Sequence, residues 1–87
     1  MREAQLEREC TKIAKANGYY DVRILKAGRS GVPDHIYLKG KRAFFVEFKT
    51  QTGRLSRLQE YEIKTIKNKG IKVYVIRTIE EFKRVLK

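Results

Sequence analysis

The feature that most constrains this fold is a predicted β-hairpin with acidic side chains at its open end. Residues 34–38 and 42–49 are two strand-like segments, and the tight turn at 39–41 folds the second segment back beside the first. Asp34 stands at the entrance of the first strand and Glu47 near the end of the second. Because the turn lies between them, we expect the two carboxylates to lie close together.

The rest of the chain predicts an α/β domain built around this hairpin. The expected elements run in the order α-β-β-β-α-β-α: a helix at 3–17, a strand at 20–25, the hairpin, a helix at 57–69, a strand at 71–77 and a short final helix. Ser56 with Gln59 and Thr78 with Glu81 match the capping-box pattern at the starts of the last two helices. The 57–69 helix is long enough for a crossover to a parallel strand, which predicts a mixed sheet with helices on its faces. Residues 1–87 are expected to form a single domain.

The charge balance indicates a polyanionic partner. The 87 residues include 21 Lys and Arg against 10 Asp and Glu, a formal net charge of +11 that is spread along the chain. Such a surface favours DNA, RNA or an anionic membrane. The apolar runs are far shorter than the roughly 20 residues that span a bilayer, and the N-terminus lacks the apolar segment of a signal peptide. We therefore expect a cytoplasmic protein, in a bacterium or a phage-infected host cell, with no membrane partner.

The acids of the hairpin suggest a metal site. Two neighbouring carboxylates repel each other and raise each other's pKa unless a cation neutralises them. Their hard oxygen ligands suit Mg²⁺ or Mn²⁺, which can lower the pKa of a bound water and stabilise charge on a phosphate oxygen. Lys49 shares the strand face of Glu47 and can orient that water. The alternative is a solvated strand face with a weak surface ion pair. A zinc cluster is excluded, since Cys10 and His35 are each the only residue of their kind.

Three short motifs resemble a known nuclease family. Gly31-Val-Pro-Asp34, Val46-Glu-Phe-Lys49 and the segment 53–59 are similar, in order, to the virus-type replication-repair nuclease (VRR-NUC) domain of the PD-(D/E)XK superfamily. The resemblance extends from Glu3 to about Ile76, and the opening helix also resembles that of archaeal Holliday-junction resolvases. It implies the restriction-endonuclease-like fold and roles for five residues. These are metal ligation by Asp34, Glu47 and the Phe48 carbonyl, catalysis by Lys49 and support by Gln59, which could equally serve as a helix cap.

The resemblance also implies a first-helix glutamate near the metal. We expect Glu7, because it lies beside Cys10 and Ala14 on the border of the apolar helix face and can reach the sheet edge. Glu3 and Glu9 remain alternatives for this position.

Basic residues on two loops flank the expected site and are candidate phosphate contacts: Lys26, Arg29, Arg54 and Arg57. Together with the hairpin acids, the resemblance implies a metal-dependent endonuclease that hydrolyses phosphodiester bonds, and the basic surface favours DNA as its substrate. The resemblance to junction resolvases implies a preference for branched or Holliday-junction DNA. A chain of this size offers little surface to grip a long substrate, so we expect a homodimer, with the apolar segment Phe82–Leu86 as a candidate interface. The alternative is a non-catalytic nucleic-acid-binding module with the same fold, against which the intact Asp34, Glu47 and Lys49 argue.

Overall fold

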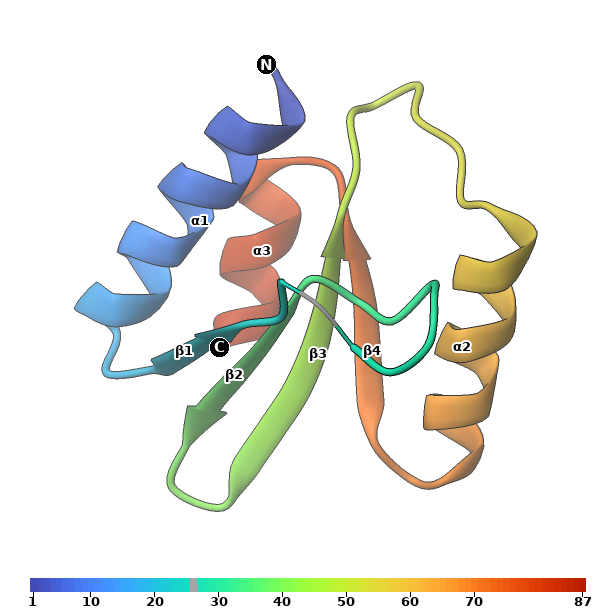
Figure 1. Cartoon of the computed structure of the whole chain (residues 1–87). Helices are drawn as coiled ribbons and strands as arrows, with labels where there is room; N and C mark the ends of the chain where they lie inside the picture. The colour runs from blue at the N-terminus through green and yellow to red at the C-terminus, as the bar shows by residue number, and fades with distance from the viewer. Residues whose placement is uncertain (26) are drawn as a thin grey trace.

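The computed structural model describes residues 1–25 and 27–87 and contains the predicted elements in the predicted order (Figure 1). They are α1 (Glu3–Ala16), β1 (Tyr20–Arg23), β2 (His35–Lys39), β3 (Arg42–Phe48), α2 (Arg57–Asn68), β4 (Lys72–Ile76) and α3 (Ile79–Leu86). The four strands form one sheet in the order β1-β2-β3-β4. Neighbouring strands are antiparallel from β1 to β3, whereas β4 runs parallel to β3. The mixed sheet and the α2 crossover are therefore confirmed.

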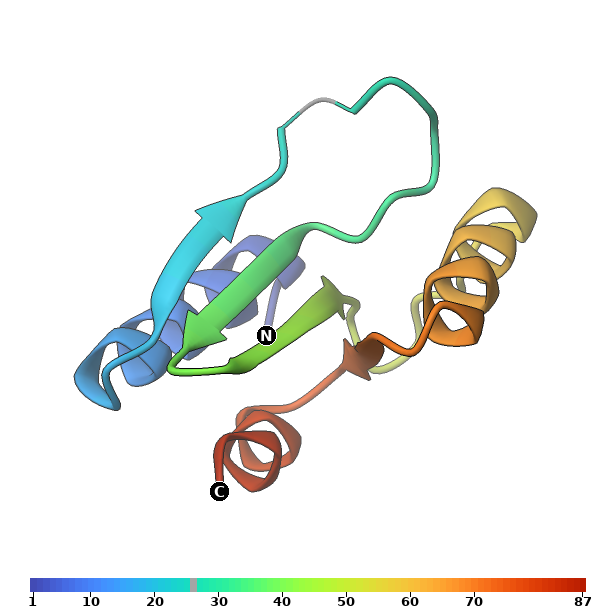
Figure 2. The ribbon, with the colours of Figure 1, turned by 90° about the horizontal axis from the view of Figure 1, so that it is seen from below.

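Helices cover both faces of the sheet (Figures 1 and 2). α1 and α3 pack on one face, where alternate residues of β3, namely Phe44, Val46 and Phe48, join the core. The helices supply Leu6, Cys10, Ala14 and Phe82 to the same cluster. α2 lies on the opposite side, next to β4. Because strand side chains alternate, Glu47 points away from the aromatic core and toward the side of α2.

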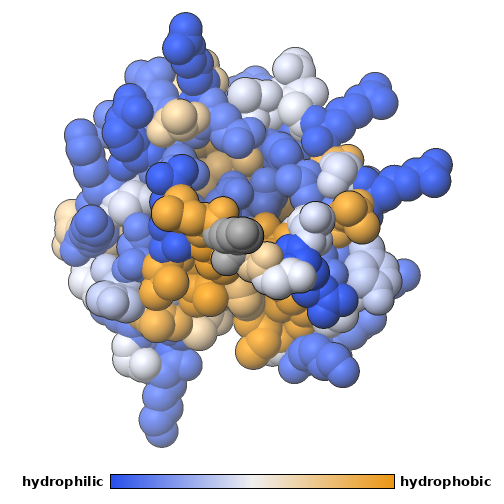
Figure 3. Space-filling model, viewed as in Figure 1, coloured by the Kyte–Doolittle hydropathy of each residue, from blue (hydrophilic) through white to orange (hydrophobic). Residues whose placement is uncertain are grey.

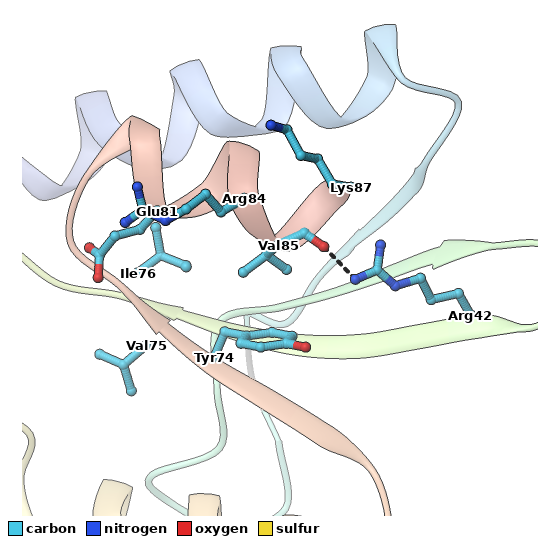
Figure 4. Close-up of a pocket in the computed structure, with 8 residues that line it drawn as sticks. All are labelled: Arg42, Tyr74, Val75, Ile76, Glu81, Arg84, Val85 and Lys87. Carbon is cyan, nitrogen blue, oxygen red and sulfur yellow. Dashed lines mark hydrogen bonds between the residues drawn. The ribbon is translucent and has the colours of Figure 1, made fainter.

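The C-terminal segment belongs to this core. Phe82 is fully buried, and Val85 and Leu86 pack against the same cluster. The guanidinium of Arg42 donates to the carbonyl of Val85 and so ties the end of α3 to β3 (Figure 4). The hydrophobic side chains that we expected at an interface are therefore largely used within the chain.

The predicted capping box is complete at α2 and only half formed at α3. At α2 the capping box is complete, since Ser56 Oγ accepts from the Gln59 N–H and Gln59 Oε1 accepts from the Ser56 N–H. At α3 Thr78 Oγ1 accepts from the Glu81 N–H, but the Glu81 carboxylate accepts from the N–H of Arg77 rather than that of Thr78.

None of the helices in the described part of the chain is long and apolar enough to cross a bilayer.

The segment before β2 is held against α2. Residues 27–34 loop out beside this helix in both ribbon views (Figures 1 and 2). Gly31 has a φ of +88° and approaches the backbone of α2 so closely that an added Cβ would lie 2.6 Å from the carbonyl oxygen of Leu58. Only glycine adopts this conformation and fits this contact at no cost. Gly31 therefore fixes the path of the chain three residues before Asp34.

Replacing Gly31 by alanine should destabilise the protein by about 2 kcal/mol or more, because a left-handed φ and a steric clash add together. For a domain of this size the Tm should fall by about 10 °C. Gly28→Ala in the same segment is the control, since a Cβ added there would meet no described atom within 4 Å beyond its chain neighbours. Thermal unfolding followed by circular dichroism checks both variants, and equal Tm values would contradict the close contact.

Candidate active site

The open end of the hairpin brings two acids together. His35 pairs with Val46, so Asp34, which immediately precedes β2, stands opposite Glu47. Asp34 is anchored from both sides: its carbonyl accepts from the N–H of Ile24 at 2.7 Å, and its Oδ2 accepts from the N–H of Phe48 at 3.1 Å. The backbone of both neighbouring strands therefore positions this carboxylate at the sheet end.

Glu47 is an acid buried on the central strand β3. The residue is only 2% exposed, and its Oε2 lies 3.6 Å from Lys49 Nζ. Burial is the largest cause that raises its pKa, to about 7, and the charge of Asp34 raises it further, while Lys49 opposes the shift. The other oxygen, Oε1, is buried and has no hydrogen-bond partner among the described residues. Glu47 thus lacks part of the compensation that a buried carboxylate requires.

Gln59 reaches the same carboxylate from α2. Its Nε2 donates to Glu47 Oε2 at 3.2 Å, while its Oε1 accepts from the N–H of Ser56 at 2.9 Å. The two ends of one amide therefore cap the helix and contact the buried acid. The capping and active-site interpretations of Gln59 are compatible with each other.

The donor set fits a hard divalent cation. In the described ranges no group of three or more His, Cys, Asp or Glu side chains is arranged so that it could hold a metal ion by itself. Two carboxylates, one with an oxygen that has no hydrogen-bond partner among the described residues, match Mg²⁺ or Mn²⁺. These ions usually bind through one or two carboxylates and keep several waters. Phe48 buries its side chain in the core, so only its backbone could take part.

The three glutamates of α1 occupy different surroundings. Glu7 Oε1 lies 3.4 Å from Arg23 Nε, and Glu7 Oε2 lies 3.4 Å from His35 Nε2. Glu3 is the α1 acid whose charge contributes to the raised pKa of Glu47. Glu9 helps to raise the pKa of Cys10, which burial raises most. The structure therefore places Glu7 beside His35 and Arg23, while a small charge effect at Glu47 comes from Glu3.

Sequence reasoning did not find the partners of Glu7. His35 is buried, its Nδ1 lies 2.5 Å from Asp21 Oδ1, and its ring stacks on Tyr37. The pairing of β1 with β2 brings Asp21 beside His35, and α1 adds Glu7. No local pattern marks this arrangement, because its members come from three separate elements.

The predicted phosphate contacts differ in their surroundings. Arg29 Nε lies 3.2 Å from Oε2 of Glu62. Glu62 is a buried acid on α2 that sequence reasoning also missed. Arg54 and Arg57 are exposed, in the loop before α2 and in its first turn. Lys26 lies outside the described residues.

Comparisons with known proteins identify the family and the fold of this chain. The family model of the VRR-NUC domain matches residues 2–79. A solved VRR-NUC domain superposes with a TM-score of 0.87, at 21% identity, over 97% of this chain and 92% of that chain. The Archaeoglobus fulgidus protein Hjc, a Holliday junction resolvase from an archaeal hyperthermophile, gives a TM-score of 0.66 at 22% identity, over 86% of this chain and 67% of its own.

No curated protein matches the sequence at a significant level. At these identities the solved structures establish a shared fold, and the family model extends over most of the chain. Together they support a nuclease of the PD-(D/E)XK type. This chain belongs to the VRR-NUC domain family.

Proposed function

We propose that this protein is a divalent-cation-dependent endonuclease that hydrolyses phosphodiester bonds in DNA. The observation that carries the proposal is the pairing of Asp34 with the buried Glu47, whose Oε1 lacks a partner among the described residues. Lys49 lies beside the same carboxylate. This combination places two carboxylate ligands and the ammonium group of Lys49 at a single end of the sheet.

Each residue has a separate task in this mechanism. Asp34 and Glu47 would hold Mg²⁺ or Mn²⁺, which when bound supplies a water of lowered pKa and neutralises charge on a phosphate oxygen. The Phe48 N–H fixes Asp34, and Gln59 fixes Glu47. Lys49 offsets the charge of Glu47 and can donate a hydrogen bond to the water or to the developing oxyanion.

DNA is the proposed substrate because the net charge of +11 attracts a polyanion. The similarity to the fold of a Holliday junction resolvase supports branched or four-way DNA as the preferred form. RNA cleavage and DNA binding without cleavage are the other outcomes that a substrate panel would distinguish.

A homodimer is proposed because two sites related by a two-fold axis suit paired cuts on branched DNA. On the face of the molecule seen in Figure 3, apolar residues lie together over β1, β2 and β3. The half-buried Val22, Ile36, Leu38 and Phe45 share the sheet face opposite the main core. In the segment Phe82–Leu86, by contrast, Phe82 is fully buried and Val85 and Leu86 pack against the main core.

Asp34→Asn, Glu47→Gln and Lys49→Ala should each slow cleavage of a labelled four-way junction in Mg²⁺ by at least about 100-fold, because these groups act in the transition state. Affinity measured in Ca²⁺ should change much less, since it comes from many phosphate contacts. EDTA should abolish wild-type cleavage. Full activity in EDTA, or near-wild-type rates of the three variants, would contradict the mechanism.

Comparison of Glu3→Gln, Glu7→Gln and Glu9→Gln tests the helix acid. If Glu7 assists the metal, its variant should lose activity at low Mg²⁺ and recover at high Mg²⁺. Because the charge of Glu3 contributes to the raised pKa of Glu47, Glu3→Gln should show the same dependence of activity on Mg²⁺. Glu9→Gln, beside Cys10, should behave as the wild type. Titration of the cleavage rate with Mg²⁺ separates these cases.

Glu47 should make stability depend on pH in metal-free buffer. Its pKa rises from 4.5 to about 7 on folding, so the folded state retains a proton that the unfolded state loses. Stability from this group is therefore fully present below about pH 4.5 and is lost as the pH rises through about 7, by on the order of 3 kcal/mol. Glu47→Gln should match the wild type near pH 5 in EDTA and exceed it at pH 8.

Urea unfolding at both pH values measures this difference, with the exposed Glu60→Gln as a control whose effect should not vary with pH. Adding Mg²⁺ at pH 8 should stabilise the wild type and leave Glu47→Gln unchanged. A difference between wild type and Glu47→Gln that is constant from pH 5 to pH 8 would contradict the raised pKa.

Leu38→Lys should convert the dimer to a monomer, because it places a charge within the apolar sheet face. Tyr61→Lys is the control, since Tyr61 is an exposed aromatic residue on α2. Light scattering at micromolar concentration, with and without a four-way junction, gives the oligomeric state. A wild-type monomer in both conditions that still cuts both strands would overturn the dimer proposal.

A further inference from the structure

A buried acid on α2 contacts an arginine of the loop before β2. Glu62 Oε2 lies 3.2 Å from Arg29 Nε, and the Glu62 side chain is only 8% exposed whereas that of Arg29 is 65% exposed. An ion pair between two exposed side chains would contribute little. Burial of one partner makes this pair different, because a buried carboxylate without its cation is costly.

The same loop lies next to the proposed active site. Arg29 and Asp34 line one hollow of about 540 Å³. Gly31, between them in the sequence, packs against the backbone of α2 at Leu58. Two independent contacts therefore hold this loop on α2, the helix that also carries Gln59. One is the backbone packing of Gly31, and the other is the ion pair between Arg29 and Glu62.

The orientation of the guanidinium has a chemical consequence. A guanidinium carries five N–H donors in a rigid plane. Contact of Glu62 with Nε leaves the Nη1 and Nη2 groups for another acceptor. This pair of groups matches the spacing of two phosphate oxygens and binds them in a bidentate manner.

We propose that Glu62 is a positioning residue, which holds Arg29 so that Nη1 and Nη2 bind a DNA phosphate beside the scissile one. The inference rests on the proposed function and adds a residue that acts only through another. Arg29 contacts the substrate, whereas Glu62 sets the direction of its side chain.

Whether removal of Glu62 weakens or strengthens DNA binding distinguishes a positioning role from a simple effect of net charge. Removing an acid from a DNA-binding surface should strengthen binding if only net charge matters. If Glu62 positions Arg29, its removal should weaken binding even though the protein becomes more positive. The exposed Glu60 on the same helix gives the matched control, because Glu60→Met removes the same charge.

The experiment measures affinity for a fluorescent four-way junction in Ca²⁺ and single-turnover cleavage in Mg²⁺. Arg29→Ala should weaken binding by about 10-fold and make the slope of log K against log[salt] shallower by about 1. Glu62→Met should weaken binding in the same direction. Glu62→Gln, which can still accept a hydrogen bond from Nε, should fall between Glu62→Met and the wild type.

A double-mutant cycle tests whether Glu62 acts through Arg29. In the Arg29→Ala background, Glu62→Met should have no further effect on affinity. Arg54→Ala provides the independent comparison, because its effect should add to that of Glu62→Met. Circular dichroism checks the fold of each variant, and Glu62→Gln carries the test if Glu62→Met does not fold.

Three outcomes would overturn the inference. Glu62→Met could strengthen binding as Glu60→Met does, its effect could persist undiminished without Arg29, or both Glu62 variants could leave affinity and salt slope unchanged in a junction-cleaving protein. Any of these results would leave the proposed nuclease activity standing. A wild-type protein that binds no DNA would overturn both the activity and the role of Glu62.

Discussion

The register between β2 and β3 is the constraint on which the site depends. Because His35 pairs with Val46, Asp34 and Glu47 meet at the open end of the hairpin. A slip by one residue would turn Glu47 into the aromatic core and Phe48 toward α2. The close packing of that core opposes such a slip, so hydrophobic burial on one face of the sheet fixes the placement of charge on the other.

Glu47 shows how this placement opposes stability. Burial and the charge of Asp34 favour its protonated form, and Lys49 only partly offsets them. Gln59 and Lys49 contact one carboxylate oxygen and leave the other without a partner in the part of the chain that the structure describes. Such strongly perturbed acids are frequent at functional sites. A hard cation is the partner that would relieve both the repulsion and the unsatisfied oxygen.

The element order and the pair of acids follow from local sequence, because turn chemistry, capping and strand alternation act over a few residues. Asp34 and Glu47 are found in this way, since a single tight turn joins their strands. Contacts among elements distant in sequence are not available to the same reasoning. The surroundings of Glu7 depend on packing of α1 against His35, and those of Glu62 depend on the path of a glycine-rich loop. For both acids, tertiary packing selects a partner that helical periodicity cannot identify.

Gln59 joins the start of a helix to the chemistry of the site through a single amide. Its oxygen serves the backbone of Ser56 and its nitrogen serves Glu47, so evolution cannot tune the two functions separately at this position. Glutamate would keep the capping acceptor but place a third carboxylate beside Glu47 and Asp34. Alanine would remove both contacts at once. A substitution at this position therefore changes the capping of α2 and the surroundings of Glu47 together.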